Sequence, residues 1–366
     1  MGTKTRSKKK TILLSVFIPL GLILALVLGY VAYFVLSYHR VGDQPELEIT
    51  NPLTAEPATA TEYKLLSYNV GFCTYTPDFG FFMDGGKEGR ARSAAAVREV
   101  LAGIVDLIRE EDPDLIHLQE VDKRSDRARK VDQVAAFDEA LPDYTSVFAV
   151  NWDSPYLLYP FTGPHGAALT GIKTYSRFGI ASASRVELPV ETSLMKLVDL
   201  DRCYTVSRVP TENGKTLVLY NFHLSAYTSD GTIAVEQLEK MLADMKNEVE
   251  SGNYVIGAGD FNKDLLEDSG AIFGVPNDGY NWAQPFPEDV LEGTGMTLVA
   301  PYDPDAPVAS CRNADGPYNP EQFRITIDGF LVSGNVTVTV GSARVIDTGF
   351  AFSDHNPVEM TFTLEP

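Results

Sequence analysis

The segment Gly257 to Asn262 reads GAGDFN and directly follows the apolar run Tyr254 to Ile256. An apolar run that stops on glycines and then presents polar side chains is typical of a buried strand whose carboxyl end carries reactive groups. Asp260 and Asn262 are two residues apart, so their side chains point the same way from extended backbone. Such an acid and amide can hold an activated water molecule against a phosphate. Taken alone, the segment is equally well explained as a strand end with a polar turn.

Five other apolar segments carry polar residues of matching chemistry. They are 63–69 with Asn69 at its end, 114–120 with Glu120, 217–223 with His223, 325–332 with Asp328 inside an apolar strand, and 352–357 with Asp354 beside His355. Any one of these residues could be a structural cap or a satisfied buried polar group. Because capping alone does not require so many acids, amides and imidazoles at strand ends, the set indicates a single site.

The order of the motifs SYN, LQE, HLSA, GDFN, TIDG and SDHNP resembles the endonuclease/exonuclease/phosphatase superfamily, which includes deoxyribonuclease I, apurinic endonucleases, sphingomyelinases and inositol polyphosphate 5-phosphatases. The resemblance extends from about Tyr63 to Leu364, and GDFN with SDHNP is its most specific part. It implies the superfamily's α/β fold, a four-layered sandwich of two packed mixed sheets flanked by helices. Periodicity alone indicates only a mixed α/β protein. Many relatives have an arginine next to the isoleucine of the TIDG motif, and Arg324 is displaced from that position here. No basic DNA-binding loop is evident in the sequence.

Hydrolysis of a phosphate ester needs an in-line activated water, compensation of the developing negative charge, and a proton or metal ion for the leaving oxygen. The sequence supplies carboxylates and imidazoles but no cysteine cluster typical of zinc. Carboxylate and amide oxygens suit Mg²⁺ or Mn²⁺. We therefore expect a metal site formed by Glu120, helped by Asn69, with Asp354 binding directly or through water.

The remaining motif residues are expected to perform the acid–base chemistry. Asp260 and Asn262 would align the nucleophilic water, and His223 would face the leaving group or a phosphoryl oxygen. A lone carboxylate such as Asp328 is costly to bury in an apolar strand. The family pattern supplies His355 as its partner, and the pair would fix the imidazole tautomer. Whether Asp260 or His355 accepts the proton of the water stays open.

The N-terminus predicts membrane attachment. Five basic residues and no acid occupy residues 1–10, and residues 11–36 are uncharged and almost wholly apolar. A membrane span needs about 20 such residues, whereas the apolar region of a cleaved signal peptide usually has about 7–15. We expect a basic cytoplasmic tail (1–10), a single transmembrane anchor (11–37), an extended linker (41–62) and a catalytic domain (63–366). Because basic residues stay on the cytoplasmic side, the domain is expected outside the cell membrane. A cleaved signal peptide is the alternative.

Charge and cysteine content restrict the partners. The formal net charge is −20, and because the first 40 residues carry six positive charges and no negative ones, the rest of the chain carries −26. Such a surface repels polyanions and argues against nonspecific nucleic-acid binding, although bound metal ions can neutralise the site itself. Three cysteines, an odd number, predict buried free thiols, with a Cys203–Cys311 pair left open. We expect a monomer.

Apolar spacing predicts the elements that position the site. Helices are expected at 90–110, 131–141 and 233–249, and strands at 144–150, 202–208, 216–223, 254–259, 336–346 and 358–364. The long segment 264–322 is expected to form functional loops, in which Tyr280, Trp282 and Phe286 form an aromatic lip or a small core. Arg177 is expected in a structural ion pair or on a substrate phosphate, His117 in the core and His165 in a loop.

Together these features predict a metal-dependent phosphodiesterase or phosphatase displayed outside the cytoplasmic membrane. An anchored nuclease acting on extracellular DNA is the alternative within the same chemistry. A non-catalytic surface-binding module is disfavoured, because all six motifs keep their reactive groups. The sequence does not specify the leaving group, the number of metal ions, or the choice between a monoester and a diester.

Overall fold

The computed structural model of the chain describes residues 4–226, 232–275, 282 and 284–366, and it divides into two units, Met1–His39 and Arg40–Pro366. The first unit contains the helix α1 (Lys4–Ser37). Its part from Leu13 to Ser37 has a mean hydropathy of 2.5 and is long and apolar enough to cross a membrane.

Two mixed sheets build the second unit in the described ranges. The larger sheet contains, in spatial order, β1 (Ile49–Thr50), β4 (Thr145–Asp153), β5 (Leu169–Ser176), β3 (Leu115–Asp122), β2 (Glu62–Asn69), β16 (Val358–Leu364) and β14 (Val336–Val338), and β15 (Arg344–Val345) also pairs with β16. The smaller sheet contains β10 (Met296–Val299), β13 (Asp328–Ser333), β9 (Tyr254–Asp260), β8 (Thr216–His223), β7 (Cys203–Pro210) and β6 (Ser182–Glu187). A separate short pair is formed by β11 (Cys311–Arg312) and β12 (Arg324–Ile325). The pairs β2–β3 and β8–β9 are parallel.

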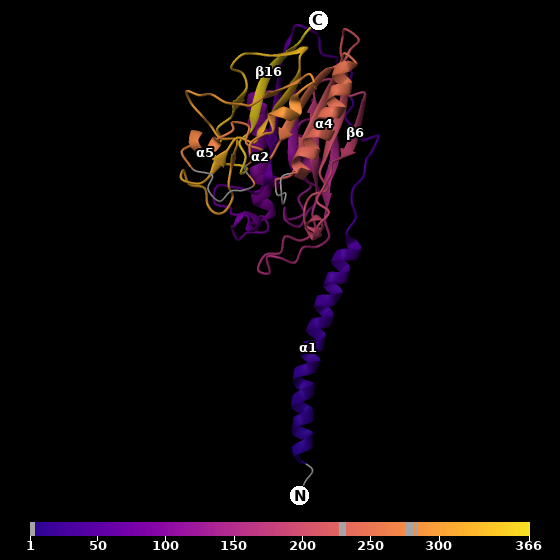
Figure 1. Cartoon of the computed structure of the whole chain (residues 1–366), viewed down its shortest axis with the longest axis vertical. Coiled ribbons are helices and arrows are strands. Elements are labelled where there is room, and N and C mark those ends of the chain that lie inside the picture. The colour runs from indigo at the N-terminus through magenta and orange to yellow at the C-terminus, as the bar shows by residue number, and fades with distance from the viewer. Residues whose placement is uncertain (1–3, 227–231, 276–281, 283) are drawn as a thin grey trace. The chain divides into compact units, whose positions relative to one another are not determined.

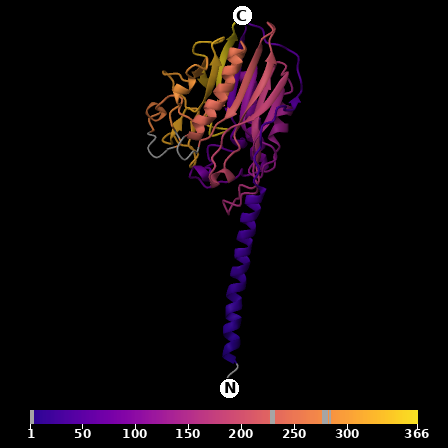
Figure 2. The same ribbon diagram turned by 45° about the vertical axis from the view of Figure 1, so that its right-hand side comes forward.

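Helices cover the outer faces of both sheets. The helices α2 (Ala94–Glu111) and α3 (Gln133–Ala140) pack on the larger sheet, and α4 (Thr232–Glu250) packs on the smaller one (Figures 1 and 2). A third apolar cluster fills the space between the sheets, where Leu65 of β2 meets Ile256 of β9. The four-layered α/β sandwich implied by the family resemblance is therefore confirmed.

Apolar spacing located the helices well. The buried face of α2 consists of six apolar residues at helical spacing: Val97, Val100, Leu101, Ile104, Val105 and Ile108. The helix begins at Ala94 rather than at residue 90, because the side chain of Ser93 accepts a hydrogen bond from the backbone N–H of Ala96 and caps the first turn. Each buried aliphatic side chain of this kind stabilises the fold by about 1.5–3 kcal/mol.

Three strand predictions were wrong in detail. The segment 325–332 is not one strand, because the backbone N–H groups of Ile327 and Asp328 donate to the hydroxyl of Ser310. Asp328 therefore begins β13 rather than lying inside a strand. The segment 336–346 divides into β14 and β15 around a turn at Gly341, whose φ is +75°. The strand β3 continues past Glu120 to Asp122, with a bulge between Leu118 and Val121.

The glycines of GAGDFN have a packing role. Gly257 and Gly259 lie inside β9 and do not form a turn. A Cβ atom at Gly259 would lie 2.1 Å from the carbonyl oxygen of Phe222 in the neighbouring strand. A side chain at this position would therefore push β8 away from β9, and with it the residues that end the two strands.

The segment 41–62 is extended, as predicted, but it is docked on the domain. The backbone of Gln44 exchanges two hydrogen bonds with Arg185 of β6, and the guanidinium of Arg185 donates to the carbonyl of Gly42 at 2.7 Å. Further along, Ile49 pairs with Val147 in β4. The segment is thus an edge of the domain rather than a free spacer.

Several other expectations are resolved by the fold. All three cysteines are free and buried, so Cys203 and Cys311 do not pair. Arg177 forms an ion pair with Asp112, which confirms the structural alternative. Trp282 packs in a small core with Phe323, and Phe286 packs on Phe261. Tyr280 lies outside the described residues.

His117 is buried between the two sheets, as expected for a core histidine. Its Nδ1 atom lies 3.1 Å from the carbonyl oxygen of Ala258 in the opposite sheet. Burial lowers the pKa of this imidazole to about 4, so the folded protein keeps it neutral in mild acid.

We predict that His117 makes the protein acid-sensitive. The unfolded chain binds a proton on this imidazole below about pH 6.5, and the folded protein does so only near pH 4, so stability falls as the pH drops through this window, by at most about 3 kcal/mol. Urea unfolding of the wild type and of His117→Gln between pH 7 and pH 4.5 measures the difference. The variant should show a flatter pH dependence, and equal slopes would mean that His117 is not held neutral.

Candidate active site

The polar residues predicted from the sequence gather at one end of the two facing sheets. In the smaller sheet, His223 ends β8, Asp260 ends β9 and Asp328 begins β13, and they are direct partners across the ladder. From the larger sheet, Asn69 ends β2 and reaches the same cluster. The carboxyl ends of parallel strands meet at one edge of a sheet, so the pairing of β8 with β9 sets the position of the site.

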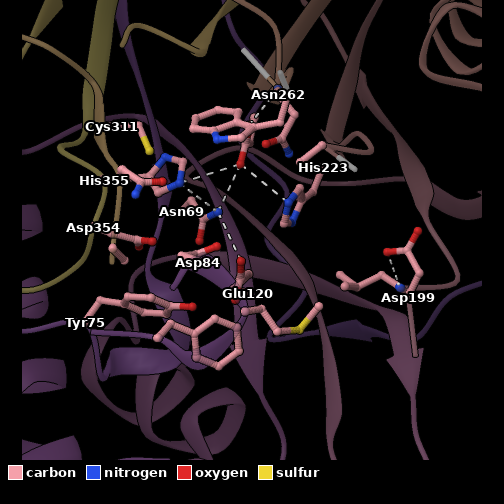
Figure 3. Close-up of a pocket in the computed structure, with 18 of the residues that line it drawn as sticks. Asn69, Tyr75, Asp84, Glu120, Asp199, His223, Asn262, Cys311, Asp354 and His355 are labelled. Atoms are coloured by element: carbon pink, nitrogen blue, oxygen red, sulfur yellow. Dashed lines mark hydrogen bonds and ion pairs between the residues drawn. The ribbon is translucent and has the colours of Figure 1, made fainter. Parts of the chain in front are cut away.

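A cavity of about 140 Å³ lies at this end (Figure 3). Seven of the eight predicted site residues line it: Asn69, Glu120, His223, Asp260, Asn262, Asp354 and His355. The eighth, Asp328, lies behind His355 and contacts its ring. Much of the remaining wall is apolar or aromatic and is formed by Tyr75, Phe81, Phe82, Met83, Trp152, Leu157, Val198, Leu200 and Trp282.

Asn69 is the centre of the hydrogen-bond network. Its Nδ2 atom lies 3.1 Å from Oδ2 of Asp260 and 3.4 Å from both Oε1 of Glu120 and Nε2 of His355. Its Oδ1 atom accepts a hydrogen bond from the backbone N–H of Gly71 at 3.0 Å. In this orientation the amide is a donor that supports Glu120, and direct ligation of a metal ion by Asn69 requires the amide to turn over.

His355 and Asp328 form a buried imidazole–carboxylate pair. Nδ1 of His355 lies 2.8 Å from Oδ2 of Asp328. The same oxygen accepts a hydrogen bond from the hydroxyl of Ser310 at 2.7 Å. The pair holds the ring so that Nε2, the other nitrogen, faces the cavity side, where Asp260 lies 3.8 Å away.

The surroundings shift the pKa values of Asp260, His355 and His223 in different directions. Burial raises the pKa of Asp260 to about 7. Burial alone lowers the pKa of His355, but the charge and hydrogen bond of Asp328 outweigh it and hold this pKa well above its usual value. Burial, with the charges of Arg202 and His355, keeps the pKa of His223 well below its usual value. These shifts favour the charged form of His355 and the neutral forms of His223 and Asp260.

Three residues that line the cavity have a strained backbone. They are Glu120, Arg202 and Asn262, with φ angles of +55°, +43° and +50°. Residues other than glycine adopt this left-handed region at a cost of about 1–3 kcal/mol, and such residues cluster at functional sites. At Asn262 the backbone N–H donates to Oδ1 of Asp260 at 2.9 Å, and the side-chain amide donates to the carbonyl of Leu224 at 2.7 Å. These bonds fix both residues of the GDFN motif.

The sequence analysis missed three buried arginines that line the cavity, Arg127, Arg202 and Arg312. Arg127 donates two hydrogen bonds to Asp122 at 2.8 and 3.0 Å, and it lies 3.8 Å from Glu120. None of the three belongs to a motif with a recognisable spacing, so nothing in the sequence pattern marked them.

Arg202 and Arg312 hold neighbouring loops in place. Arg202 donates to the carbonyl of Leu224 at 2.8 Å. Arg312 reaches the carbonyls of Thr76 and Phe79 at 3.3 and 3.4 Å and so ties the aromatic loop after β2 to the loop after β11.

His165, expected as a loop residue, also lines the cavity. Its ring centroid lies 5.7 Å from that of Trp152, and burial lowers its pKa to about 3. It is therefore a neutral part of the aromatic wall. Arg324, in contrast, donates to the carbonyls of Phe273 and Pro320 outside the cavity.

Glu120 and Asp354 fit a hard divalent cation. Both line the cavity, and the side chain of Glu120 keeps 21% of its surface exposed there. Burial raises the pKa of both carboxyl groups, and the charge of Asp354 adds to this effect at Glu120. Two such carboxylates are costly to hold as anions, and a cation bound between them offsets that cost.

A second cluster could also hold an ion. Asp260, Asp328 and His355 offer ligand atoms that lie within 4.8 Å of one another. However, the 2.8 Å contact between His355 and Asp328 is an ordinary hydrogen bond, and a metal ion would have to break it. Ligation of an ion by Glu120 and Asp354 leaves this hydrogen bond intact.

The comparison with known families agrees with this geometry. The model of the Endonuclease/Exonuclease/phosphatase family matches residues 66–355, so the chain belongs to this family. Its members hydrolyse phosphoester bonds, and they generally depend on a divalent metal ion. Among curated proteins, none matched this sequence.

Solved structures share the fold at low sequence identity. The endonuclease/exonuclease/phosphatase from Beutenbergia cavernae DSM 12333 is 20% identical, with 83% of this chain and 72% of that chain covered and a TM-score of 0.55. The human Nocturnin catalytic domain with bound sulfate is 16% identical, with 87% and 97% covered and a TM-score of 0.53. ANGEL2, a 2′,3′-cyclic phosphatase in complex with adenosine-2′,3′-vanadate, is also 16% identical, with 90% and 100% covered and a TM-score of 0.53.

We predict that His355 and Asp328 act as one unit. His355→Ala should lower turnover by about 10²–10⁴-fold, the range for acid–base groups. Because Asp328 acts through the ring of His355, adding Asp328→Asn should then cost little more. Steady-state kinetics of both single variants and the double variant measure this. Losses that multiply independently would assign Asp328 a separate structural role.

Proposed function

We propose that this chain is a divalent-metal-dependent hydrolase of phosphoester bonds whose catalytic domain is held outside the cytoplasmic membrane by α1. One observation carries the catalytic part. The half-buried carboxylates Glu120 and Asp354 line the same cavity as the cluster of Asp260, His355 and His223. A cation site beside a set of proton-exchanging groups is the arrangement that phosphoester hydrolysis requires.

Glu120 and Asp354 would hold Mg²⁺ or Mn²⁺, with Asn69 supporting Glu120 through its amide. A bound ion supplies charge compensation for the phosphoryl oxygens and the leaving oxygen. Asn262, fixed by its bond to Leu224, orients the attacking water together with Asp260.

We assign Asp260 as the base that accepts the proton of the water. Its pKa of about 7 suits proton transfer near neutral pH. His355, kept protonated by Asp328, is better suited to donate a hydrogen bond from Nε2 to a phosphoryl oxygen. His223 lies 3.5 Å from Asp260 through Nε2, and it would face the leaving group or a phosphoryl oxygen.

We predict that activity requires the metal ion and that Glu120 sets its affinity. With bis(p-nitrophenyl) phosphate, excess EDTA should abolish turnover, and Mg²⁺ or Mn²⁺ should restore it. Glu120→Gln should raise the half-saturating metal concentration at least about tenfold, because it replaces a charged ligand by a neutral one. The melting temperature should not fall, since burial already disfavours the charge of Glu120.

Glu139→Gln, an exposed acid on α3, is the matched control and should behave as the wild type. Full activity in excess EDTA would contradict the metal requirement. Plasmid DNA assayed beside the small diester tests the nuclease alternative. The charge of −26 on the chain after residue 40 predicts weak turnover of DNA.

We predict that the N-terminus is cytoplasmic and that the domain is outside. The three native cysteines are buried, so a new surface cysteine can be labelled without background. In intact cells, a membrane-impermeant maleimide should label Val340→Cys, a fully exposed position in the domain. It should label Ser7→Cys, in the basic tail, only after permeabilisation. The opposite pattern would reverse the topology, and a mature protein lacking the first 35 or so residues would mean a cleaved signal peptide.

A further inference from the structure

Exposed apolar side chains surround one side of the cavity mouth. We name this group the apolar rim: it consists of Tyr156, Leu158, Tyr159 and Phe161, in the loop between β4 and β5, together with Met83. Phe161 exposes 76% of its surface and Tyr159 exposes 58%. Single exposed apolar residues are common on soluble proteins, but several together beside a site indicate a surface that contacts something apolar.

The apolar rim is continuous with the wall of the cavity. The ring centroid of Phe161 lies 5.7 Å from that of Tyr159, and Tyr159 lies 5.4 Å from Phe82, which lines the cavity. Met83 both lines the cavity and is exposed. Contacting aromatic side chains therefore lead from the apolar rim to the wall of the cavity.

The chain enters the domain at the same end. Arg40 is separated from the end of α1 at Ser37 by two residues, and its guanidinium donates to the carbonyl of Leu188, just after β6. The last residue of β6 pairs with the first residue of β7, and the loop that joins these strands lines the cavity through Val198 and Leu200. The cavity end of the domain is therefore the end nearest, along the chain, to the apolar helix.

Charge argues for an apolar rather than an electrostatic contact. With −26 on the chain after residue 40, the domain has no excess of basic charge to attract anionic headgroups. Tyrosine and phenylalanine side chains, in contrast, favour the boundary between headgroups and acyl chains regardless of lipid charge.

We infer that the apolar rim rests in the interfacial layer of the lipid bilayer that α1 crosses, and that the cavity receives the phosphoester headgroup of an amphiphilic lipid from that layer. The second part rests on the proposed function, and the first does not. The lipid's apolar portion would lie along the rim and the aromatic wall, which places its phosphate near Glu120 and Asp260.

Fluorescence quenching in the full chain tests the contact with the bilayer. Phe161→Trp and Val340→Trp are reconstituted into phosphatidylcholine vesicles whose acyl chains carry bromine, a short-range quencher. Val340 is the matched control: it is fully exposed, and the adjacent Thr339 bonds Glu62 at the start of β2, the end opposite Asn69.

The two native tryptophans give the same background in both variants. We expect the added tryptophan at position 161 to be quenched at least about twofold more than that at position 340. Equal quenching would overturn the bilayer contact, and would favour a protein as the partner of the rim.

A pair of matched diesters tests the substrate class. Hexadecyl p-nitrophenyl phosphate in phosphatidylcholine vesicles and methyl p-nitrophenyl phosphate in solution share a leaving group and differ only in the alkyl chain. The full chain should hydrolyse the hexadecyl ester with a kcat/KM at least about tenfold higher. The double substitution Leu158→Ser with Phe161→Ser should lower this value about tenfold and change that for the methyl ester less than twofold.

The outcomes separate the two proposals. Equal kcat/KM for the two esters, or equal losses in the variant, would overturn the lipid substrate. Hydrolysis of neither ester would exclude diester hydrolysis and with it the lipid diester substrate, while the quenching result would still decide the bilayer contact. Retained turnover of the methyl ester shows that the double variant is folded.

Discussion

The burial of several carboxylates at one end of two facing sheets is the constraint on which the structure of the site depends. The register of β8, β9 and β13 makes His223, Asp260 and Asp328 neighbours. Buried anions are costly unless they are paired, so the surrounding contacts are those that compensate charge. Asn69 donates a hydrogen bond to Asp260, and His355 contacts Asp328. Arg127 donates to Asp122 and forms an ion pair with Glu120. A cation would complete the compensation at Glu120 and Asp354.

Much of this site could be predicted because local sequence determines it. Polar residues in six apolar segments, in an order that resembles the family, identified all eight residues, and the structure brings seven to one cavity with the eighth directly behind. The hydrophobic spacing of α2 is also local, and the helix that it predicts was confirmed. The four-layered arrangement could be predicted only from the family resemblance, because the periodicity of apolar residues does not specify how two sheets pack on each other.

What could not be predicted depends on contacts between distant segments. Ser310 ends the expected strand at 325–332 by accepting two backbone hydrogen bonds, and no local signal in 325–332 reports it. The segment 41–62 was expected to be an extended linker, and its docking on β6 depends on Arg185, which is 143 positions from Gly42. Arg127, Arg202 and Arg312 are likewise defined by the groups that they reach rather than by a motif. The backbone N–H of Gly71 donates to Oδ1 of Asn69 and so orients the amide. In this orientation Nδ2 of Asn69 faces Glu120 and donates to it.

We propose that Glu120 and Asp354, rather than Asp260, Asp328 and His355, hold the metal ion. Calorimetric titration of the full chain with Mn²⁺ measures this binding without a substrate. Binding should be saturable in the wild type, keep its affinity in Asp328→Asn, and be lost when Glu120→Ala and Asp354→Ala are combined. Binding that survives the double substitution but disappears in Asp328→Asn would instead locate the metal at the other cluster.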